Sequence, residues 1–333
     1  MPSSWTPEEL LRAARGYQVA AVLAAGAELD LFGLVSTGPL EAGEVARRAG
    51  SHPEATAVLM DALAALGLLC KEDGAYALPA QLGGALTEGA PDGVIPMVRH
   101  QANCMRRWAQ LGAVCRDGGP ARREFSIRGE EGDRESFINA MTVASRPQLE
   151  ALVPEVVALE PRHLLDVGGG PGTWSIAFLQ ARPELLVTYL DLPEVVPIAR
   201  RHVEAAGLAD RATFATGNYL EDALPAGADL AWVSAIVHQH SREENRQLLG
   251  RVREALVPGG QVVIRDVFMD SSRTRPAGGA LFAINMLVAT EGGCTFTVEE
   301  MAEDLEAAGF EEPRLMRQGE YMDSLVRARK GTH

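Results

Sequence analysis

A glycine-rich turn with an acidic residue at its start lies in the second half of the chain. It reads Asp166-Val167-Gly168-Gly169-Gly170-Pro171-Gly172 and follows an apolar run. A strand, a glycine-rich turn and a helix in succession form a cradle for a nucleotide. A dinucleotide site prefers G-x-G-x-x-G, whereas counting from Gly168 the third position is Thr173. The Asp166 carboxylate would repel a pyrophosphate and would suit the ammonium of a methionine moiety. The turn therefore favours S-adenosylmethionine (SAM) over NAD, with a purely structural turn as the alternative.

Further polar residues follow the next two predicted strands. Asp191 ends the second strand, where a carboxylate can accept hydrogen bonds from two ribose hydroxyls. Leu192 comes next and is expected to cover the edge of the adenosine. Asn218 follows the third strand, and its side-chain oxygen is expected to meet the adenine amine; an ordinary turn residue is the alternative.

A histidine after the fourth predicted strand is the candidate general base. His238 is of the residue type that titrates near neutrality, so it suits removal of a proton from an acceptor hydroxyl. Asp266 closes the fifth strand at the same sheet edge and is expected to orient the imidazole. A structural histidine is the alternative for His238. His240 is a second candidate for a catalytic role, and His238, His240 and Asp266 are also of a type that binds iron or zinc. Nothing in their spacing requires a metal, so we expect none.

Alternating apolar and helical segments position these residues. The apolar runs predict strands at 163–167, 185–190, 212–215, 230–233 and 261–265. Helical segments separate them, as in a doubly wound parallel sheet. The chain ends with a predicted antiparallel pair at 314–317 and 324–327. The second half is therefore predicted to be an α/β, Rossmann-like domain.

The first part of the chain has the pattern of a winged helix. It predicts helices at 20–31, from Pro39, and from His52 to Gly67, followed by a hairpin of strands at 68–71 and 76–78. The third helix contains no Lys or Arg over 54–66, and DNA affinity depends on basic contacts to phosphate. Its apolar surface favours dimerisation. We expect a mainly helical dimerisation domain at 1–95, a helical connector at 96–150 and a catalytic domain at 151–333.

Composition limits the possible partners. The 333 residues carry a net charge of −14 and are 47% hydrophobic, which favours a globular chain and disfavours nucleic acid or an acidic membrane. The four cysteines form no C-x-x-C pair, so neither a zinc site nor a disulfide framework is expected. No signal peptide or transmembrane run is recognisable. We expect a cytoplasmic protein.

These motifs together resemble a known family. Leu165 to Gly172, Asp191-Leu192-Pro193, Gly217-Asn218-Tyr219 and Val237-His238 are similar to the small-molecule O-methyltransferases of the caffeate, hydroxyindole and bacterial polyketide type. The resemblance extends over nearly the whole chain. It implies a homodimer in which each N-terminal part helps to close its partner's active site. It also implies SAM as cofactor, S-adenosylhomocysteine as product and a small-molecule acceptor.

The resemblance assigns roles residue by residue. Its general base falls on His238, in the string His238-Gln239-His240-Ser241 where the family has His-Asp-Trp-Ser. One orienting acid matches Asp266, and the second falls near Thr295. A lysine of plant members is Ser234 here. The cofactor-binding residues that we expect are Asp166, Gly168, Gly170, Gly172, Asp191, Leu192, Asn218, Tyr219 and Ser234. The acceptor-binding residues that we expect are His100, Gln101, Met105, Asn139, Met141, Arg146, His240 and Asn285.

O-methylation of a small hydroxylated metabolite is the function that the sequence favours. The altered string after His238 leaves S- or C-methylation of a small keto or hydroxy acid as an alternative. A relative that binds SAM without methyl transfer, as a hydroxylase, decarboxylase or pericyclase, is another. A SAM-sensing winged-helix regulator would need a basic recognition helix, which is lacking.

Overall fold

The computed structural model describes residues 5–332, which divide into two compact units. One unit takes in the described residues up to Arg106 together with Arg123–Val143. The other takes in Arg107–Arg122 and the described residues from Ala144 onward. The predicted connector is shared between the two units. The three-part division expected from the sequence stays a prediction, and each unit is described by itself below.

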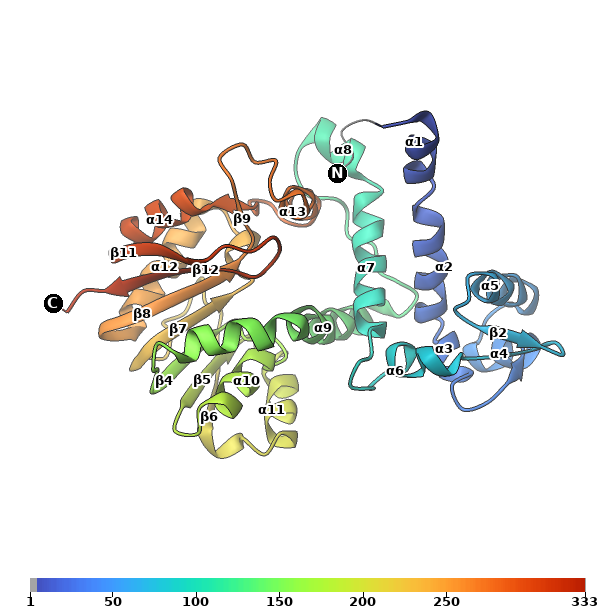
Figure 1. Cartoon of the computed structure of the whole chain (residues 1–333), viewed down its shortest axis with the longest axis horizontal. Helices are drawn as coiled ribbons and strands as arrows, with labels where there is room; N and C mark the ends of the chain where they lie inside the picture. The colour runs from blue at the N-terminus through green and yellow to red at the C-terminus, as the bar shows by residue number, and fades with distance from the viewer. Residues whose placement is uncertain (1–4, 333) are drawn as a thin grey trace. The chain divides into compact units, whose positions relative to one another are not determined.

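A seven-stranded sheet forms the centre of the C-terminal unit (Figure 1). Across the sheet the strands are β11 (Phe310–Arg317), β12 (Ser324–Lys330), β8 (Leu256–Asp266), β7 (Ala228–Ser234), β4 (His163–Val167), β5 (Leu186–Asp191) and β6 (Ala212–Thr216). The strands from β8 to β6 are parallel, and β12 pairs antiparallel with both β8 and β11. The predicted doubly wound sheet with a terminal antiparallel pair is confirmed.

Helices cover both faces of this sheet. One face packs Leu152 of α9 (Gly129–Val157) and Phe178 of α10 (Thr173–Ala181) against Trp232 of β7. The other face packs α12 (Arg242–Ala255) and α14 (Val298–Ala307). The remaining elements are α8 (Leu111–Asp117), α11 (Val196–Ala205), η2 (Ala209–Arg211), η3 (Val237–Gln239), α13 (Ala277–Ala289) and a parallel pair of β9 (Phe268–Met269) and β10 (Phe296–Thr297). Apolar burial on both faces explains why the parallel strands read as continuous hydrophobic runs.

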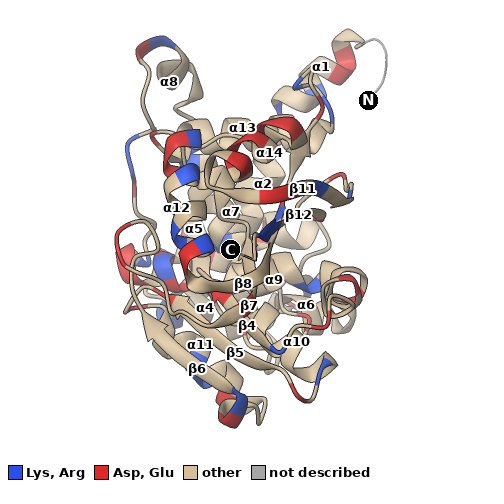
Figure 2. Cartoon of the chain, turned by 90° about the vertical axis from the view of Figure 1, so that its left-hand side faces the viewer, with Lys and Arg blue, Asp and Glu red and all other residues tan. Residues whose placement is uncertain are grey.

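A buried acid joins the two helices of the second face. Asp304 of α14 has no exposed surface and accepts hydrogen bonds from Arg242 at 2.8 Å and Arg246 at 2.8 Å. Figure 2 shows the acidic stretches of α14 and the mixed acidic and basic stretches of α12. A buried carboxylate requires such paired partners. The Asp304 cluster therefore fixes α14 against α12.

The N-terminal unit is helical with a small wing. Its elements are α1 (Pro7–Ala14), α2 (Tyr17–Glu28), α3 (Leu31–Leu34), β1 (Leu40–Glu41), α4 (Ala42–Ala49), α5 (Pro53–Ala65), β2 (Cys70–Glu72), β3 (Ala75–Ala77), η1 (Ala80–Leu82), α6 (Gly83–Leu86) and α7 (Ile95–Trp108). The wing is a three-stranded sheet in the order β1, β3, β2. The second predicted helix begins at Ala42 and not at Pro39, because Leu40 pairs with Tyr76 as a strand.

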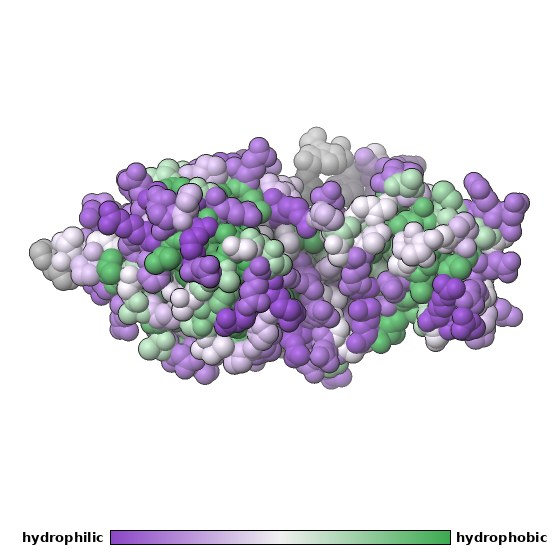
Figure 3. Space-filling model, turned by 90° about the horizontal axis from the view of Figure 1, so that it is seen from below, coloured by the Kyte–Doolittle hydropathy of each residue, from purple (hydrophilic) through white to green (hydrophobic). Residues whose placement is uncertain are grey.

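Large apolar side chains remain exposed on the first two helices of this unit and at Trp5 just before them. Trp5, Leu10, Leu11, Tyr17 and Val19 are each more than half exposed. In Figure 3 apolar side chains lie between polar ones over the displayed face. Isolated apolar residues are normal on a surface, whereas a run along consecutive helices is typical of an interface. No helix among residues 5–332 is long and apolar enough to cross a membrane.

Candidate active site

The glycine-rich turn lies at the carboxyl end of β4 and leads into α10. Gly168, Gly170 and Gly172 have φ values of 64°, 57° and 80°, a left-handed region that favours glycine. A Cβ atom on Gly168 would lie 2.7 Å from the Ile236 side chain, and one on Gly169 would lie 2.5 Å from the Tyr189 ring. The turn therefore needs small residues both for its backbone conformation and for close packing.

Asp166 is buried directly beneath this turn. It is 1% exposed and accepts a 2.5 Å hydrogen bond from the Ser175 hydroxyl of α10. Burial, with a smaller contribution from the negative charge of Asp191, raises the pKa of Asp166 to about 7, against the opposing effect of the Ser175 bond. A carboxylate held in this way gains from a cationic ligand group. Ser175 was not predicted, because its spacing from Asp166 becomes meaningful only once α10 folds back over β4.

Asp191 is tied to the same turn from the end of β5. It accepts a 2.8 Å hydrogen bond from the Gly170 amide and a 2.7 Å bond from the Leu192 amide. Burial raises the pKa of Asp191, and these backbone bonds oppose the shift. Tyr189, a residue that the sequence did not single out, donates to the Gly170 carbonyl at 2.6 Å. The two predicted acids thus lie at one glycine turn.

The two residues predicted after β6 make different contacts. The Asn218 side-chain oxygen accepts a 3.0 Å bond from the Leu220 amide, as in a local turn, so its adenine contact stays a prediction. The Tyr219 ring approaches Gly168, and its hydroxyl lies 3.0 Å from His240 Nε2. Burial raises the pKa of Tyr219 to about 12 and lowers the pKa of His240. Tyr219 and His240 thus join the loop after β6 to the loop after β7.

His238 and Asp266 form a buried pair. Asp266 Oδ2 lies 2.9 Å from His238 Nδ1, and Asp266 Oδ1 also accepts a 2.8 Å bond from the Val267 amide. The ring of Phe282 meets the imidazole edge-on at 4.8 Å between centroids. The carboxylate therefore fixes the imidazole tautomer, with Nδ1 facing Asp266 and Nε2 left for other contacts.

Tight backbone packing holds the loop that carries His238. Ala235, the residue after β7, has a φ of 57°, which turns the chain sharply before η3. Asn245 of α12 donates a 2.9 Å bond to the Val237 carbonyl. A Cβ on Gly293 would lie 2.5 Å from the His238 carbonyl oxygen. The imidazole thus extends from a loop that is closely packed and hydrogen-bonded to α12.

The predicted acceptor-binding residues are divided between the two units. His100, Gln101, Met105, Asn139 and Met141 belong to the N-terminal unit, and Arg146, His240 and Asn285 belong to the C-terminal unit. Within the first, the His100 ring lies 5.1 Å from that of Phe137. Within the second, Asn285 of α13 accepts a 3.0 Å hydrogen bond from Trp108. Their role in acceptor binding stays a prediction.

A buried arginine is the main feature of the C-terminal unit that sequence reasoning missed. Arg265 of β8 is 3% exposed, and burial lowers its pKa to about 10. It donates to the Ser234 hydroxyl at 2.8 Å and to the Gln148 side-chain oxygen at 3.0 Å, and its guanidinium lies 4.8 Å from the Trp174 ring. The position of Arg265 directly before the predicted Asp266 was the sequence feature that could have indicated its place in the site.

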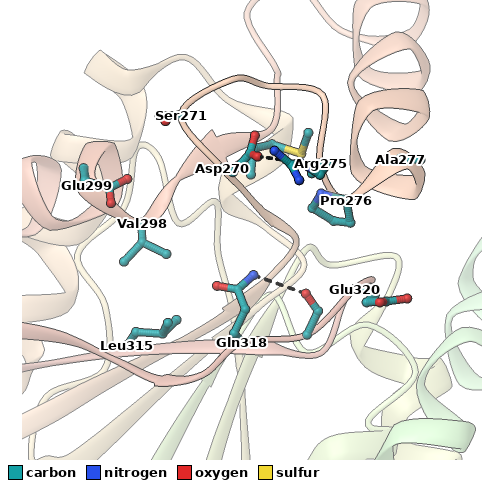
Figure 4. Close-up of a pocket in the computed structure, with 12 residues that line it drawn as sticks. Asp270, Ser271, Arg275, Pro276, Ala277, Val298, Glu299, Leu315, Gln318 and Glu320 are labelled. Carbon is teal, nitrogen blue, oxygen red and sulfur yellow. Dashed lines mark hydrogen bonds and ion pairs between the residues drawn. The ribbon is translucent and has the colours of Figure 1, made fainter.

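A hollow of about 740 Å³ lies elsewhere in the C-terminal unit. Figure 4 shows it between the segment from Met269 to Ala277, α14 and the β11–β12 turn, with the Asp270–Arg275 ion pair on its wall. None of its lining residues belongs to the glycine turn or to the His238–Asp266 pair. Among residues 5–332, no group of three or more His, Cys, Asp or Glu side chains is arranged to hold a metal.

Known proteins share both the sequence pattern and the fold. An O-methyltransferase domain model matches residues 114–311, and an O-methyltransferase dimerisation domain model matches residues 11–81. A 3-hydroxy-5-methyl-1-naphthoate 3-O-methyltransferase of Streptomyces sahachiroi is 33% identical over 95% of this chain and 93% of its own. The tetracenomycin polyketide synthesis 8-O-methyltransferase of Streptomyces glaucescens is 31% identical, covering 92% of both chains.

Solved structures of O-methyltransferases have the same fold as this chain. Human N-acetylserotonin methyltransferase in complex with SAM superimposes with a TM-score of 0.80 at 27% identity over 100% of both chains. An O-methyltransferase family protein from Burkholderia thailandensis gives a TM-score of 0.82 at 28% identity over 99% of both chains. With the glycine turn, the paired acids and the His–Asp pair in place on this fold, the chain belongs to the SAM-dependent O-methyltransferase family that acts on small hydroxylated metabolites.

Proposed function

We propose that His238 is the general base that removes the proton from the acceptor hydroxyl and that Asp266 orients it. The observation that carries the proposal is the buried His238–Asp266 pair, at 2.9 Å on the imidazole nitrogen Nδ1. With Nδ1 engaged, Nε2 is the nitrogen that takes the proton. The imidazolium that forms is stabilised by the adjacent carboxylate.

The residues at the glycine turn suit SAM. The cofactor supplies an electrophilic methyl group, and the chain supplies the groups that hold its other parts. Asp166, whose burial disfavours its charge, gains most from the ammonium of the methionine tail. Asp191 keeps lone pairs for the ribose hydroxyls, and Leu192 flanks the adenine. Gly168, which has no room for a Cβ beside Ile236, keeps the backbone of the turn free of a side chain.

The remaining predicted cofactor contacts come from the glycine turn and from the loops after β6 and β7. Gly170 and Gly172 shape the turn, and Tyr219 packs its ring toward Gly168. Ser234 and Asn218 contribute polar atoms from the ends of β7 and β6. These assignments rest on position within the fold and on the chemistry of each side chain.

The acceptor that we propose is an aromatic compound with a hydroxyl group. Two relatives of more than 30% identity are named for naphthoate and tetracenomycin polyketide O-methylation. A phenolic hydroxyl loses its proton as the methyl bond forms, so a base at the position of His238 has a definite task. The five N-terminal and three C-terminal residues given above are the proposed acceptor contacts.

We also propose that the enzyme is a homodimer in the cytoplasm. The dimerisation-domain match at residues 11–81 and the exposed apolar side chains of α1 and α2 support a homodimer. An interface through these helices would bury roughly 2,000 Å² or more, the size typical of obligate dimers. We place the enzyme in the cytoplasm, without nucleic acid or membrane as partner.

Replacement of His238 tests the general-base role. His238→Ala should lower kcat by about 10²–10⁴, the usual contribution of a positioned base. SAM affinity should stay within about twofold, because cofactor binding does not require proton removal. Asp266→Asn should show a smaller loss, because it disturbs orientation and keeps the base. Turnover of hydroxynaphthoates and other phenols is measured as S-adenosylhomocysteine by mass spectrometry.

A matched histidine serves as the control. His163 lies at the opposite, amino end of β4 and pairs with Thr188, so His163→Ala should keep kcat. A His238→Ala enzyme with less than about a tenfold defect and a flat pH–rate profile would contradict the base assignment. That result would favour an acceptor without a proton to lose, such as a thioether.

A further inference from the structure

A positive charge is buried at the edge of the cofactor turn, and no carboxylate among residues 5–332 is in hydrogen-bond contact with it. The Arg265 guanidinium is 3% exposed, and the partners that it contacts are the neutral side chains of Ser234, Gln148 and Trp174. Two acids act on the guanidinium without a hydrogen bond to it: Asp266, which is engaged by His238 and the Val267 amide, and Asp323, which accepts from the Tyr321 amide. Burying an arginine without a carboxylate in hydrogen-bond contact is costly, so such a site favours an anionic ligand.

The register of the sheet places this charge beside the glycine turn. Val167 pairs with Val233, so Ser234 follows in register next to Gly168, the first glycine. Arg265 in turn pairs with Ser234 across β7 and β8. Trp174, which packs on the guanidinium, lies in the first turn of α10, directly after the glycines. Arg265 therefore contacts α10, which follows the turn, and β7, the strand that pairs with β4 before the turn.

Arg265 also determines which polar atoms its neighbours present to a ligand. An arginine can only donate hydrogen bonds, so Ser234 and Gln148 accept from it through their oxygens. The Ser234 hydroxyl proton and the Gln148 amide protons then remain to donate elsewhere. Both side chains are partly exposed, whereas the cation behind them is buried. The result is a pair of donors backed by a positive charge, which is the chemistry of a carboxylate site.

We infer that Arg265, acting with Ser234 and Gln148, binds the carboxylate of the methionine tail of SAM. The tail carries an ammonium and a carboxylate on one carbon atom. Asp166, below the turn, suits the ammonium, and the Arg265 cluster on the neighbouring strands suits the carboxylate. The low polarity around the buried guanidinium strengthens its attraction for the ligand carboxylate. The carboxylate itself would accept hydrogen bonds from Ser234 and Gln148. This inference rests on SAM as the cofactor and is independent of the role of His238.

The test compares SAM with decarboxylated SAM, which keeps the sulfonium and the ammonium and lacks only the carboxylate. Both affinities are measured by calorimetry on the full-length protein. Arg265→Met removes the charge and keeps much of the side-chain length. We expect it to weaken SAM about tenfold or more, the scale of a charged hydrogen bond. The affinity for decarboxylated SAM should stay within about twofold, because that ligand has no carboxylate to lose a partner.

A second variant tests the inference without removing the buried arginine, in case Arg265→Met fails to fold. Gln148→Glu puts a carboxylate against the guanidinium, which satisfies Arg265 and repels the carboxylate of the ligand. SAM affinity should again fall, and decarboxylated SAM should bind at least as well as before. Arg317→Met is the matched control, because Arg317 of β11 also reaches α9, through a 2.6 Å contact with Glu155. It should leave both affinities unchanged.

The outcomes separate ligand binding from a purely structural role. If Arg265→Met weakens both ligands by the same factor, the arginine only supports the fold. If Gln148→Glu leaves SAM affinity unchanged, the carboxylate lies elsewhere. Either result overturns the inference. Neither result bears on proton removal by His238, since no turnover is measured.

Discussion

Asp166 is expected to reduce the stability of the ligand-free protein in return for cofactor affinity. Its carboxyl group is 1% exposed, and burial raises its pKa from 3.8 to about 7. In an unfolded chain an aspartate titrates near its ordinary value. The folded protein therefore binds a proton at this site that the unfolded chain has already released at pH 6. Asp166→Asn removes the ionisation and keeps an oxygen that accepts the Ser175 bond.

The sign and size of the effect follow from this shift. Below about pH 4 both states are protonated, so the group contributes nothing. As the pH rises from about 4 to 7, the unfolded chain ionises first and the free energy of unfolding of the wild type falls. A shift of roughly three pH units at 1.36 kcal/mol each gives at most about 4 kcal/mol, fully lost above pH 7. The neutral amide of the Asp166→Asn variant has no such dependence.

Urea unfolding without cofactor, at pH 5 and pH 8, measures this difference. Asp166→Asn should be more stable than the wild type by about 1–4 kcal/mol at pH 8 and by less at pH 5. Its affinity for SAM should fall by about 1.5–3 kcal/mol, because a charged partner of the ammonium is lost. Asp210→Asn, at an exposed site in η2, is the control and should change neither quantity. A variant that is destabilised equally at both pH values, or that binds SAM normally, would refute the reasoning.

Two further substitutions test the packing around the base. Gly293→Ala should lower kcat about tenfold with SAM affinity unchanged, because its Cβ would lie 2.5 Å from the His238 carbonyl oxygen. Gly250→Ala, whose Cβ would meet nothing within 4 Å, is the control for steady-state kinetics, and equal effects of the two would contradict the argument. Asp304→Asn should lower the free energy of unfolding by about 2 kcal/mol, since it leaves Arg242 without its buried carboxylate partner. Chemical denaturation measures this loss, and an unchanged midpoint would show that the pair contributes little.

The sequence predicted the features that depend on neighbours along the chain. The glycine turn follows a strand and opens a helix, so its backbone conformation and the place of Asp166 could be predicted from local pattern alone. Asp191, His238 and Asp266 were also predictable, because the carboxyl ends of parallel strands share one edge of a sheet. The helix expected from Pro39 was misplaced, since the strand at Leu40 forms only by pairing with a segment far along the chain.

Other features of the site required the tertiary structure. Burial cannot be read from a residue's type, so the raised pKa of Asp166 and the neutral hydrogen-bond partners of Arg265 appear only when α9 and α10 pack on the sheet. The contact between Tyr219 and His240 likewise joins loops that follow different strands. Local periodicity determines which residues reach the edge of the sheet, but strand order and helix packing decide which of them meet. That is because hydrogen bonding and desolvation depend on distances of a few ångströms, which sequence spacing does not fix.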